Sequence, residues 1–324
     1  MADVIKKFKN NTAILAGKIT EITQKREGDD KNGKHYISFK GVIQCGEQSV
    51  MARNFEVFCY ALTSKGKTNK NYAAFNSLLE EYESKEKEED EEEDGSIMVE
   101  LSGSISDNTY VNASNDLKEG LKFGMNHIEK FTDYKCDLEL DAYVQNISDE
   151  IDANDKETGR KRMTLMLMDF SKNPVVIKAV VRKEDIDNVE GCGYDEAGVF
   201  GNKIALSYIP HEDVQESKGG WGKKVTKGHS YTELTVVGCE PASEIPDDGG
   251  SEEILDADGV KNLLYARKEY TKEKKDAGYQ GNKENGSSAT TSAKTSAKTS
   301  AAASSKKSTK AKKVEEDEED DLPF

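Results

Sequence analysis

Two stretches of the chain show the same order of apolar and polar positions. In each, three strand-like segments are followed by a short helical pattern and two more strand-like segments. The second segment is the clearest, because Ile37, Phe39, Gly41 and Ile43 alternate with polar or aromatic residues. The ten predicted strands are 13–22, 35–44, 50–60, 97–105, 121–131, 136–147, 161–170, 175–182, 203–209 and 231–239.

This order predicts the fold. The helical patterns lie around 72–82 and at 184–190, in each case after the third strand. Three meander strands, a helix and two closing strands make up the OB-fold, which binds oligonucleotides across its middle strands. We therefore predict a mainly β protein with two OB-fold-like five-stranded Greek-key barrels in tandem. Gly17, in the middle of the first strand, is where we expect that strand to bend around the barrel.

The composition predicts how the chain is divided. The first barrel, 1–133, carries an acidic insertion at 80–94, and the second barrel is expected at 134–246. Residues 247–313 are predicted to be a flexible linker with a short helix at 252–276, because 277–313 is built of Ser, Thr, Ala, Gly and Lys. An acidic tip, 314–324, ends the chain, and we expect this C-terminal tail to be disordered.

The charge is unevenly distributed along the 324 residues. The net charge of −16 is matched by two acidic segments, 80–94 with −9 and 315–321 with −7. Residues 1–79 hold thirteen Lys/Arg against seven Asp/Glu, whereas 134–245 hold fourteen against twenty-one. The first barrel therefore has the sign of charge that phosphates require, and the second is the weaker candidate for binding DNA.

Cations and aromatic rings share one face of the first predicted barrel. Single strands are held by a positive path that follows the phosphates and by rings on which bases stack. On this basis the candidate DNA-binding residues are Lys34, Tyr36, Lys40, Arg53, Phe58, Tyr60, Lys65 and Lys67, with Lys70 extending the path. The alternative for Phe58 and Tyr60 is burial in the core, because the third strand is apolar on both faces.

The second predicted barrel offers fewer candidates. Lys178 and Arg182 lie on the polar face of its third strand, and Trp221, Lys223 and Lys224 lie in a glycine-rich loop before its last strand. Loops at this position of an OB-fold contact ligands, so the tryptophan is expected to stack on a base. The alternative is that this ring packs back on the barrel.

The last residues indicate a segment that another protein reads. Seven acids stay extended through their mutual repulsion, Pro323 blocks regular structure, and Phe324 carries a ring and a terminal carboxylate. The tip formed by Asp320, Asp321, Leu322, Pro323 and Phe324 resembles that of bacterial and phage single-stranded-DNA-binding proteins, which ends Asp-Asp-(Ile/Leu)-Pro-Phe. The resemblance implies that the tip recruits replication or recombination proteins such as a polymerase, helicase, primase or recombinase.

Other classes of function find no support. The sequence has no Gly-x-x-x-x-Gly-Lys-(Ser/Thr) motif, no metal-ligand spacing among its four histidines and five scattered cysteines, and no catalytic residue that we can assign. We expect no enzyme activity, no cofactor and no metal. The absence of a signal peptide and of a long apolar run predicts a cytoplasmic protein without membrane contact, in a bacterial host cell if phage-encoded.

We therefore expect a single-stranded DNA-binding protein that coats DNA without sequence specificity in replication, recombination and repair, including the response to DNA damage. Two barrels in one chain depart from the common bacterial pattern of one barrel per subunit, so a monomer and a homo-oligomer both stay open. A protein-interaction scaffold or a single-stranded RNA-binding protein could use the same barrels.

Overall fold

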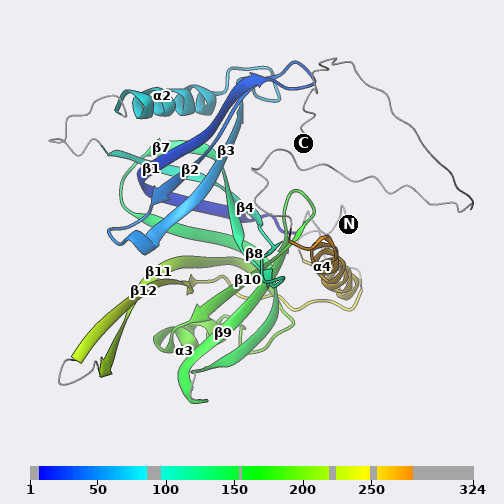
Figure 1. Cartoon of the computed structure of the whole chain (residues 1–324). Coiled ribbons are helices and arrows are strands. Elements are labelled where there is room, and N and C mark those ends of the chain that lie inside the picture. The colour runs from blue at the N-terminus through cyan, green and yellow to red at the C-terminus, as the bar shows by residue number, and fades with distance from the viewer. Residues whose placement is uncertain (1–6, 86–95, 153–154, 219–223, 249–253, 280–324) are drawn as a thin grey trace, which may run out of the picture.

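The computed structural model describes residues 7–85, 96–152, 155–218, 224–248 and 254–279, except for the side chains of 213–229. Residues 280–324, which include the tip 314–324 that is predicted to be disordered, lie outside these residues. Ten strands form one continuous sheet in the order β11-β12-β10-β9-β8-β1-β2-β3-β7-β4, and two further pairings, β1–β4 and β11–β8, close it into two barrels. Figure 1 shows the two barrels one above the other.

The first barrel has the strand order of an OB-fold. Its strands pair as β1-β2-β3-β7-β4 and β4 returns to β1, with β3 and β7 parallel and the other pairs antiparallel. Helix α2 lies between β3 and β4 and buries Phe75, Leu78 and Leu79. The elements are β1 (Asn11–Asp29), β2 (His35–Gln44), the short helix η1 (Ser49–Met51), β3 (Ala52–Tyr60), α2 (Lys70–Lys85), β4 (Ile97–Asp107), the hairpin β5 (Tyr110–Val111) and β6 (Leu117–Lys118), and β7 (Leu121–Lys130).

The second barrel repeats this arrangement. Its strands pair as β8-β9-β10-β12-β11 with closure between β11 and β8, and β10 is parallel to β12. The prediction of a mainly β chain with tandem OB-like barrels is therefore confirmed. The elements are β8 (Lys135–Ile151), β9 (Glu157–Met168), β10 (Pro174–Val181), η2 (Lys183–Asp185), α3 (Ile186–Gly191), β11 (Phe200–Lys218), β12 (Lys224–Gly238) and a C-terminal helix, α4 (Ala257–Ala277).

Several strands are longer than predicted. β1 continues to Asp29, and β11 and β12 extend as a paired hairpin to Lys218 and Lys224, beyond the body of the second barrel in Figure 1. These extensions are polar, so they lack the alternation on which the prediction was based. Backbone hydrogen bonding to the neighbouring strand keeps them in the sheet without a buried face.

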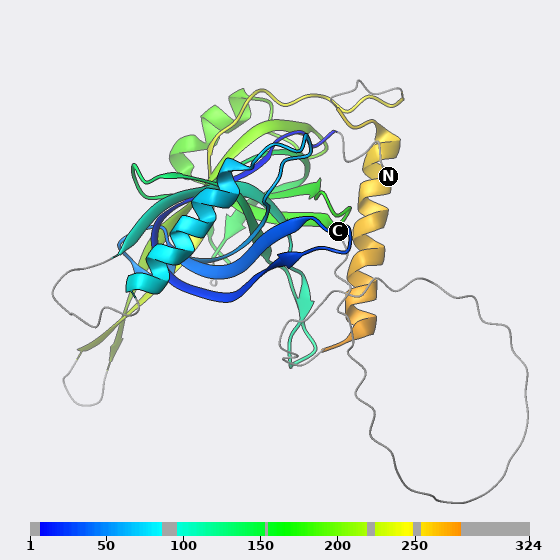
Figure 2. The same ribbon diagram turned by 90° about the horizontal axis from the view of Figure 1, so that it is seen from above.

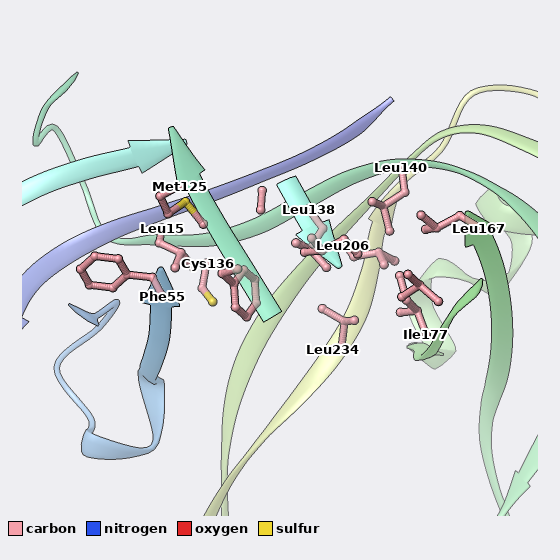
Figure 3. Close-up of a cluster of buried hydrophobic side chains, with 14 of the residues drawn as sticks. Leu15, Phe55, Met125, Cys136, Leu138, Leu140, Leu167, Ile177, Leu206 and Leu234 are labelled. Carbon is pink, nitrogen blue, oxygen red and sulfur yellow. The ribbon is translucent and has the colours of Figure 1, made fainter. Parts of the chain in front are cut away.

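The two barrels share one sheet and one core. Residues 11–16 of β1 pair with 135–140 of β8 in antiparallel register, while β1 also pairs with β4 and β8 with β11. Buried side chains follow this seam in Figure 3, from Phe55 and Met125 in the first barrel through Leu138 to Leu167 and Ile177 in the second. Because strand edges and apolar side chains are joined across the seam, the barrels form one packed unit.

Gly17 lies where β1 changes partner. Residues 13–19 of β1 pair with β4, and from Lys18 onward the strand pairs with β2. A Cβ on Gly17 would lie 1.9 Å from the carbonyl oxygen of Gln44, so no larger residue fits without backbone movement. The glycine permits the close approach that turns the strand around the barrel.

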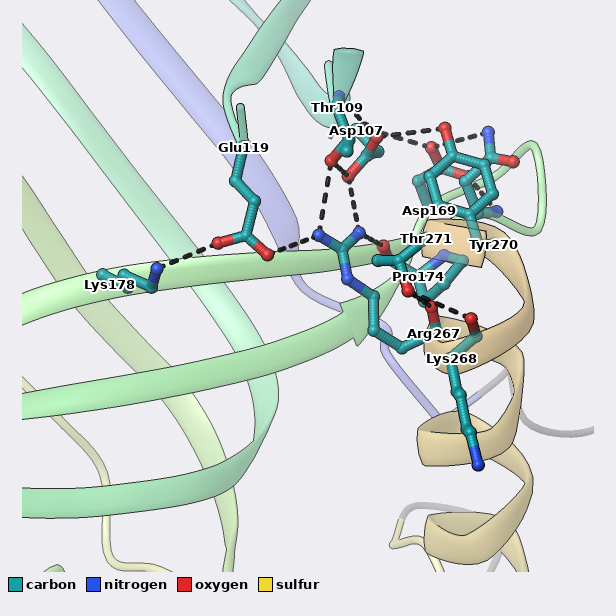
Figure 4. Close-up of polar contacts among 11 residues, drawn as sticks. Asp107, Thr109, Glu119, Asp169, Pro174, Lys178, Arg267, Lys268, Tyr270 and Thr271 are labelled. Atoms are coloured by element: carbon teal, nitrogen blue, oxygen red, sulfur yellow. Dashed lines mark hydrogen bonds and ion pairs between the residues drawn. The ribbon is translucent and has the colours of Figure 1, made fainter. Parts of the chain in front are cut away.

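Helix α4 is held against both barrels by one buried arginine. The Arg267 guanidinium donates to Asp107 (3.0 Å) and Glu119 (2.7 Å) of the first barrel and to the carbonyl oxygen of Pro174 (2.9 Å) of the second, as Figure 4 shows. Tyr270 adds a bond from its hydroxyl to Asp107 (3.0 Å). Figure 2 shows α4 along one side of the two barrels, away from α2.

Candidate functional site

Three aromatic rings form a ladder on the outer face of β2 and β3. Tyr36 lies opposite Tyr60 in the register, and Phe58 lies opposite Ser38, one step along the same face. The rings of Tyr36 and Phe58 are stacked with centroids 5.0 Å apart, and Phe58 meets Tyr60 edge-on at 5.1 Å. We call Tyr36, Phe58 and Tyr60 the aromatic face. It lies on the strands by which OB-folds bind oligonucleotides.

The rings of the aromatic face differ in exposure. Phe58 is 44% exposed, although it is a large apolar residue in the middle of a strand, whereas Tyr36 is only 8% exposed. Tyr36 therefore supports Phe58 from one side. The sequence had suggested that its ring is open to a base, but the ring is largely covered. Phe58 and Tyr60 lie outside the core, so the alternative of burial does not hold for them.

Cations flank the aromatic face at both ends. The Lys34 ammonium lies 5.7 Å from the Tyr60 ring centroid, within the range of a cation–π contact. Lys40 lies on the same face of β2 as Tyr36, and its ammonium is 3.4 Å from Glu56, which Lys122 also contacts at 2.6 Å. One carboxylate therefore lies between two ammonium groups, and the cluster keeps a positive excess.

The Tyr60 end of the face is fixed by a polar loop. The Tyr60 hydroxyl donates to Asp30 (3.1 Å), and burial together with this carboxylate raises the pKa of Tyr60 to about 12. The hydroxyl is therefore a neutral donor at physiological pH. Lys65 and Lys67 lie exposed in the turn that follows β3. Lys70 begins α2 and is exposed as well.

Next to this loop, His35 contacts Asp29 (2.8 Å) and Glu27 (3.3 Å). Hydrogen bonds to Asp29 and then to Glu27 raise the pKa of His35 above its ordinary value. The turn end of the β1–β2 hairpin is thus stabilised by an ion pair when the imidazole is protonated.

Arg53 lies outside the aromatic face, contrary to the sequence prediction. Its guanidinium lies over the ring of Tyr208 of β11, with the guanidinium carbon Cζ 4.1 Å from the ring centroid. It also donates to the Thr232 hydroxyl of β12 at 2.9 Å. Two further bonds go to the carbonyl oxygens of Val50 and Ala52. Its two terminal nitrogens and its flat face are thus engaged, with Tyr208 and Thr232 joining it to the second barrel, and this removes it from the predicted phosphate path.

A groove of about 500 Å³ lies on the outer face of the second barrel. β8, β9, β10 and β12 form its walls, and its polar lining includes Asn146, Ser148, Arg162, Thr164, Lys178, Tyr231 and Thr232. The Tyr231 ring is stacked on His211 with centroids 5.4 Å apart. The groove thus combines cations, hydroxyl and amide groups, one aromatic ring and one carboxylate, Glu233, which is paired with Arg160.

Lys178 and Arg182, two of the cations predicted in the second barrel, have ion-pair partners, and so has Arg162. Lys178 is exposed in the groove and bonds Glu119 at 2.9 Å. Arg182 lies beyond the end of β10 and bonds Asp185 at 2.7 Å. Arg162 bonds the buried Glu150, yet more than half of its side chain is exposed. Of these three, Lys178 and Arg162 line the groove and Arg182 does not.

Part of the predicted site lies outside the described residues. These positions are Trp221 and Lys223 in the β11–β12 loop, and Asp320, Asp321, Leu322, Pro323 and Phe324 at the tip. Lys224 begins β12, but its side chain is not described.

Sequence reasoning missed Arg162, Thr164 and Tyr231. The signal was available for the first two, because Arg162 and Thr164 alternate with the buried Met163 and Leu165 in the second strand of the barrel. That is the position that Tyr36 and Lys40 occupy in the first barrel. Tyr231 was placed at the start of a strand, and only the pairing of β10 with β12 brings it to the groove.

No group of three or more potential metal ligands occurs among the described residues. Within the same residues, no helix has the length and apolarity needed to cross a membrane.

Comparison with known families identifies the chain. A family model described as YorF matches residues 9–277, which include both barrels and α4. The chain belongs to the YorF family. No curated protein matches this YorF-family chain.

Solved structures similar to this YorF-family chain are remote from it. The wild-type single-stranded DNA-binding protein of Thermus aquaticus is 8% identical, with 74% of this chain and 96% of that chain covered and a TM-score of 0.35. A deletion mutant of the Thermus aquaticus protein is 10% identical, with 74% and 98% covered and a TM-score of 0.36. A replication protein A heterotrimer bound to single-stranded DNA is 12% identical, with 78% of this chain and 60% of that chain covered and a TM-score of 0.19.

Proposed function

We propose that the chain binds single-stranded DNA without sequence specificity, with its bases on the aromatic face and its phosphates on the surrounding lysines. The observation that carries this proposal is the 44% exposed Phe58, held between Tyr36 and Tyr60 on the outer face of β2 and β3. A large ring left open in the middle of a strand loses the free energy of burial, which a stacked base would restore.

The charges near Phe58 favour a polynucleotide over an apolar ligand. Lys34 lies against Tyr60, and Lys40 and Lys122 share one carboxylate at the other end of the face. Rings with cations on both sides are the arrangement that holds a single strand whatever its sequence, because every base has a stacking face and every nucleotide a phosphate.

The second barrel extends this surface. Arg53 of β3 bonds Thr232, and Thr232 lines the groove that holds Arg162, Lys178 and Tyr231. In this proposal a strand leaves the aromatic face along β3 and enters the groove near the start of β3, where Arg53 joins the β-strand to Thr232 of the groove. In this proposal one chain offers two contact surfaces to one strand.

The cellular role is proposed from the sequence of the tip. We place the protein in DNA replication, recombination or repair, with Asp320 to Phe324 recruiting partner proteins, and its source in a phage or a bacterium. An acidic segment ending in Leu-Pro-Phe suits a partner pocket with a basic rim and an apolar floor.

The test is a titration of the full chain with fluorescein-labelled oligo(dT), comparing wild type with Phe58→Ala and Phe58→Leu. Base stacking contributes about 1–3 kcal/mol, so Phe58→Ala should weaken binding about 5- to 150-fold. Phe58→Leu is the matched control, because it keeps Tyr36 covered but has no aromatic face, and it should weaken binding to a similar extent.

Three outcomes would contradict the proposal. Oligo(dT) affinity unchanged in both variants would remove the aromatic face from the site. Preference for a matched RNA in competition would point to recognition of the 2′-hydroxyl, and thus to an RNA-binding protein. No binding of either nucleic acid would favour a protein-interaction scaffold.

Deletion of 315–324 should leave DNA affinity undiminished while partner binding is lost.

A further inference from the structure

A stripe of cations runs along the exposed side of α4. At 3.6 residues per turn, Lys261, Lys268, Lys272 and Lys275 fall on one side of the helix. All four are exposed, and Tyr265 lies among them with 63% of its surface exposed. We call these five residues the α4 stripe. The opposite side of the helix is buried and includes Leu263, Ala266 and Arg267.

The stripe is not needed for the fold of α4. Within the described part of the chain, no ion pair joins Lys268, Lys272 or Lys275 to an acid, whereas Lys261 contacts Asp258 at 3.0 Å. Lysines in a last turn stabilise a helix through its dipole, but only Lys275 of the stripe lies there. A tyrosine ring that is 63% exposed gains little free energy of burial from its position in the isolated chain.

The helix that carries the stripe is fixed next to the groove. Arg267 bonds Glu119, and Glu119 in turn bonds Lys178 in the groove of the second barrel (Figure 4). Arg267 also bonds the carbonyl oxygen of Pro174, four residues before Lys178 on β10. The anchored side of α4 thus adjoins the Lys178 end of the groove, and Lys268 follows Arg267 in sequence.

We propose that the α4 stripe is a third contact surface for single-stranded nucleic acid, and that it binds the phosphates of the strand as this leaves the groove. The inference rests on the proposed function and adds to it a surface outside both barrels. Lys268 and Lys272 are about 6 Å apart along the helix axis, and Lys272 and Lys275 about 4.5 Å. Phosphates repeat every ~3.4 Å along one strand of B-DNA and are farther apart when a strand is stretched.

Tyr265 favours a nucleic acid over an acidic protein as the partner. A run of carboxylates such as polyglutamate would be bound by the lysines alone, whereas a single strand presents both phosphates for the lysines and bases for the ring. The fixed position of the helix adds to this, because a surface that is already ordered loses little entropy when the strand binds.

The test measures oligo(dT) affinity of the full chain over a range of salt concentrations. The variant is Lys268→Ala/Lys272→Ala/Lys275→Ala, and the matched control removes three exposed lysines elsewhere, Lys130→Ala/Lys156→Ala/Lys203→Ala. Each phosphate contact contributes about −0.7 to the slope of log affinity against log salt, so loss of three flattens the slope by about 2. Over an approximately fourfold rise in salt, wild type should lose about 20-fold more affinity than the variant.

Tyr265→Ala should weaken binding about 5- to 150-fold at every salt concentration, and Tyr265→Phe should restore it, because only the ring is needed to stack. Equal slopes for wild type and the α4 variant, with binding intact, would overturn the α4 stripe and leave the barrel sites standing. An α4-dependent affinity for polyglutamate with no change towards oligo(dT) would identify an acidic protein as the partner and would also overturn it. Failure of wild type to bind oligo(dT) would instead reject the proposed function itself.

Discussion

Removal of the Arg267 side chain should release α4 from the barrels. The side chain is 10% exposed and donates to Asp107, Glu119, Thr109 and the carbonyl oxygen of Pro174. In Arg267→Ala the carboxylate of Asp107, whose side chain is 2% exposed, loses its only ion-pair partner among the described residues. Breaking a buried ion pair by removing one partner costs about 3–5 kcal/mol.

The contacts that remain place the effect near the lower limit. Asp107 keeps bonds from the Thr109 amide (2.7 Å) and the Tyr270 hydroxyl (3.0 Å). Glu119 keeps its ion pair with Lys178 and is partly exposed. Burial acts to raise the pKa of Glu119, but hydrogen bonds from Lys178 and Arg267 outweigh it and hold this pKa below its ordinary value. The loss in free energy of unfolding is therefore expected at about 3 kcal/mol, or about 6–12 °C in Tm at roughly 2–4 °C per kcal/mol.

Two further variants separate the charge of Arg267 from its shape. Arg267→Lys keeps the charge but cannot reach both barrels with one planar fork, so it should lose about half as much stability as Arg267→Ala. Arg267→Met keeps most of the apolar stem and should resemble Arg267→Ala if the fork is what matters.

The assay combines thermal unfolding with amide hydrogen exchange. In Arg267→Ala, protection should fall first in α4 and in the hairpin of β5 and β6, which α4 contacts, before it falls in β1 and β8. A loss of less than about 1 kcal/mol, or unchanged protection of α4, would show that the helix is held by its apolar side alone, and the reasoning would fail.

Two further predictions concern the first barrel. In an NMR titration the pKa of His35 should lie above its ordinary value of 6.5, and it should return towards that value in Glu27→Gln/Asp29→Asn. The stabilising ion pair is complete below pH 6.5 and is lost as pH rises through the raised pKa. A His35 that titrates at or below 6.5 would refute this prediction. Gly17→Ala should destabilise the chain by about 3 kcal/mol in thermal unfolding because of its clash with Gln44, whereas Gly28→Ala, which meets no atom within 4 Å, should stay within about 0.5 kcal/mol. Equal stability of the two glycine variants would show that β1 does not need a glycine at its bend.

The local fold could be predicted from the sequence, but the contact between the barrels could not. Alternation identifies β2 because Ile37 and Phe39 lie on its core side and Ser38 and Lys40 on the other. The pairing of β1 with β8 has no such signal, since β1 is apolar whether its edge is covered by another barrel or by a second molecule. Arg267 gives no signal either, because a buried arginine in a lysine-rich helix looks like one more surface cation.

The same limit applies to the candidate site. Tyr36 and Phe58 share a face, as the alternation indicates, but which of the two covers the other depends on the cross-strand register. Arg53 shows that charge alone is ambiguous, because a guanidinium that could bind a phosphate instead stacks on Tyr208. Residue type and face are read from the sequence, whereas the partner of a long cationic side chain is set by elements distant in the chain.

The proposed function divides the contacts with a strand between the two barrels and α4 by their chemistry, and this division has a measurable consequence. The aromatic face has rings at its centre, so loss of Phe58 should lower affinity by a similar factor at low and high salt. The α4 stripe consists mostly of cations, and the groove holds two cations, Arg162 and Lys178, beside one carboxylate, Glu233. The loss of affinity on removing these cations should become smaller as salt rises. The reason is that releasing counterions into a more concentrated salt solution gains less free energy. If one strand occupies all three surfaces, combining Phe58→Ala with the α4 lysine variant should add the two effects, because no described side chain joins the two sites directly.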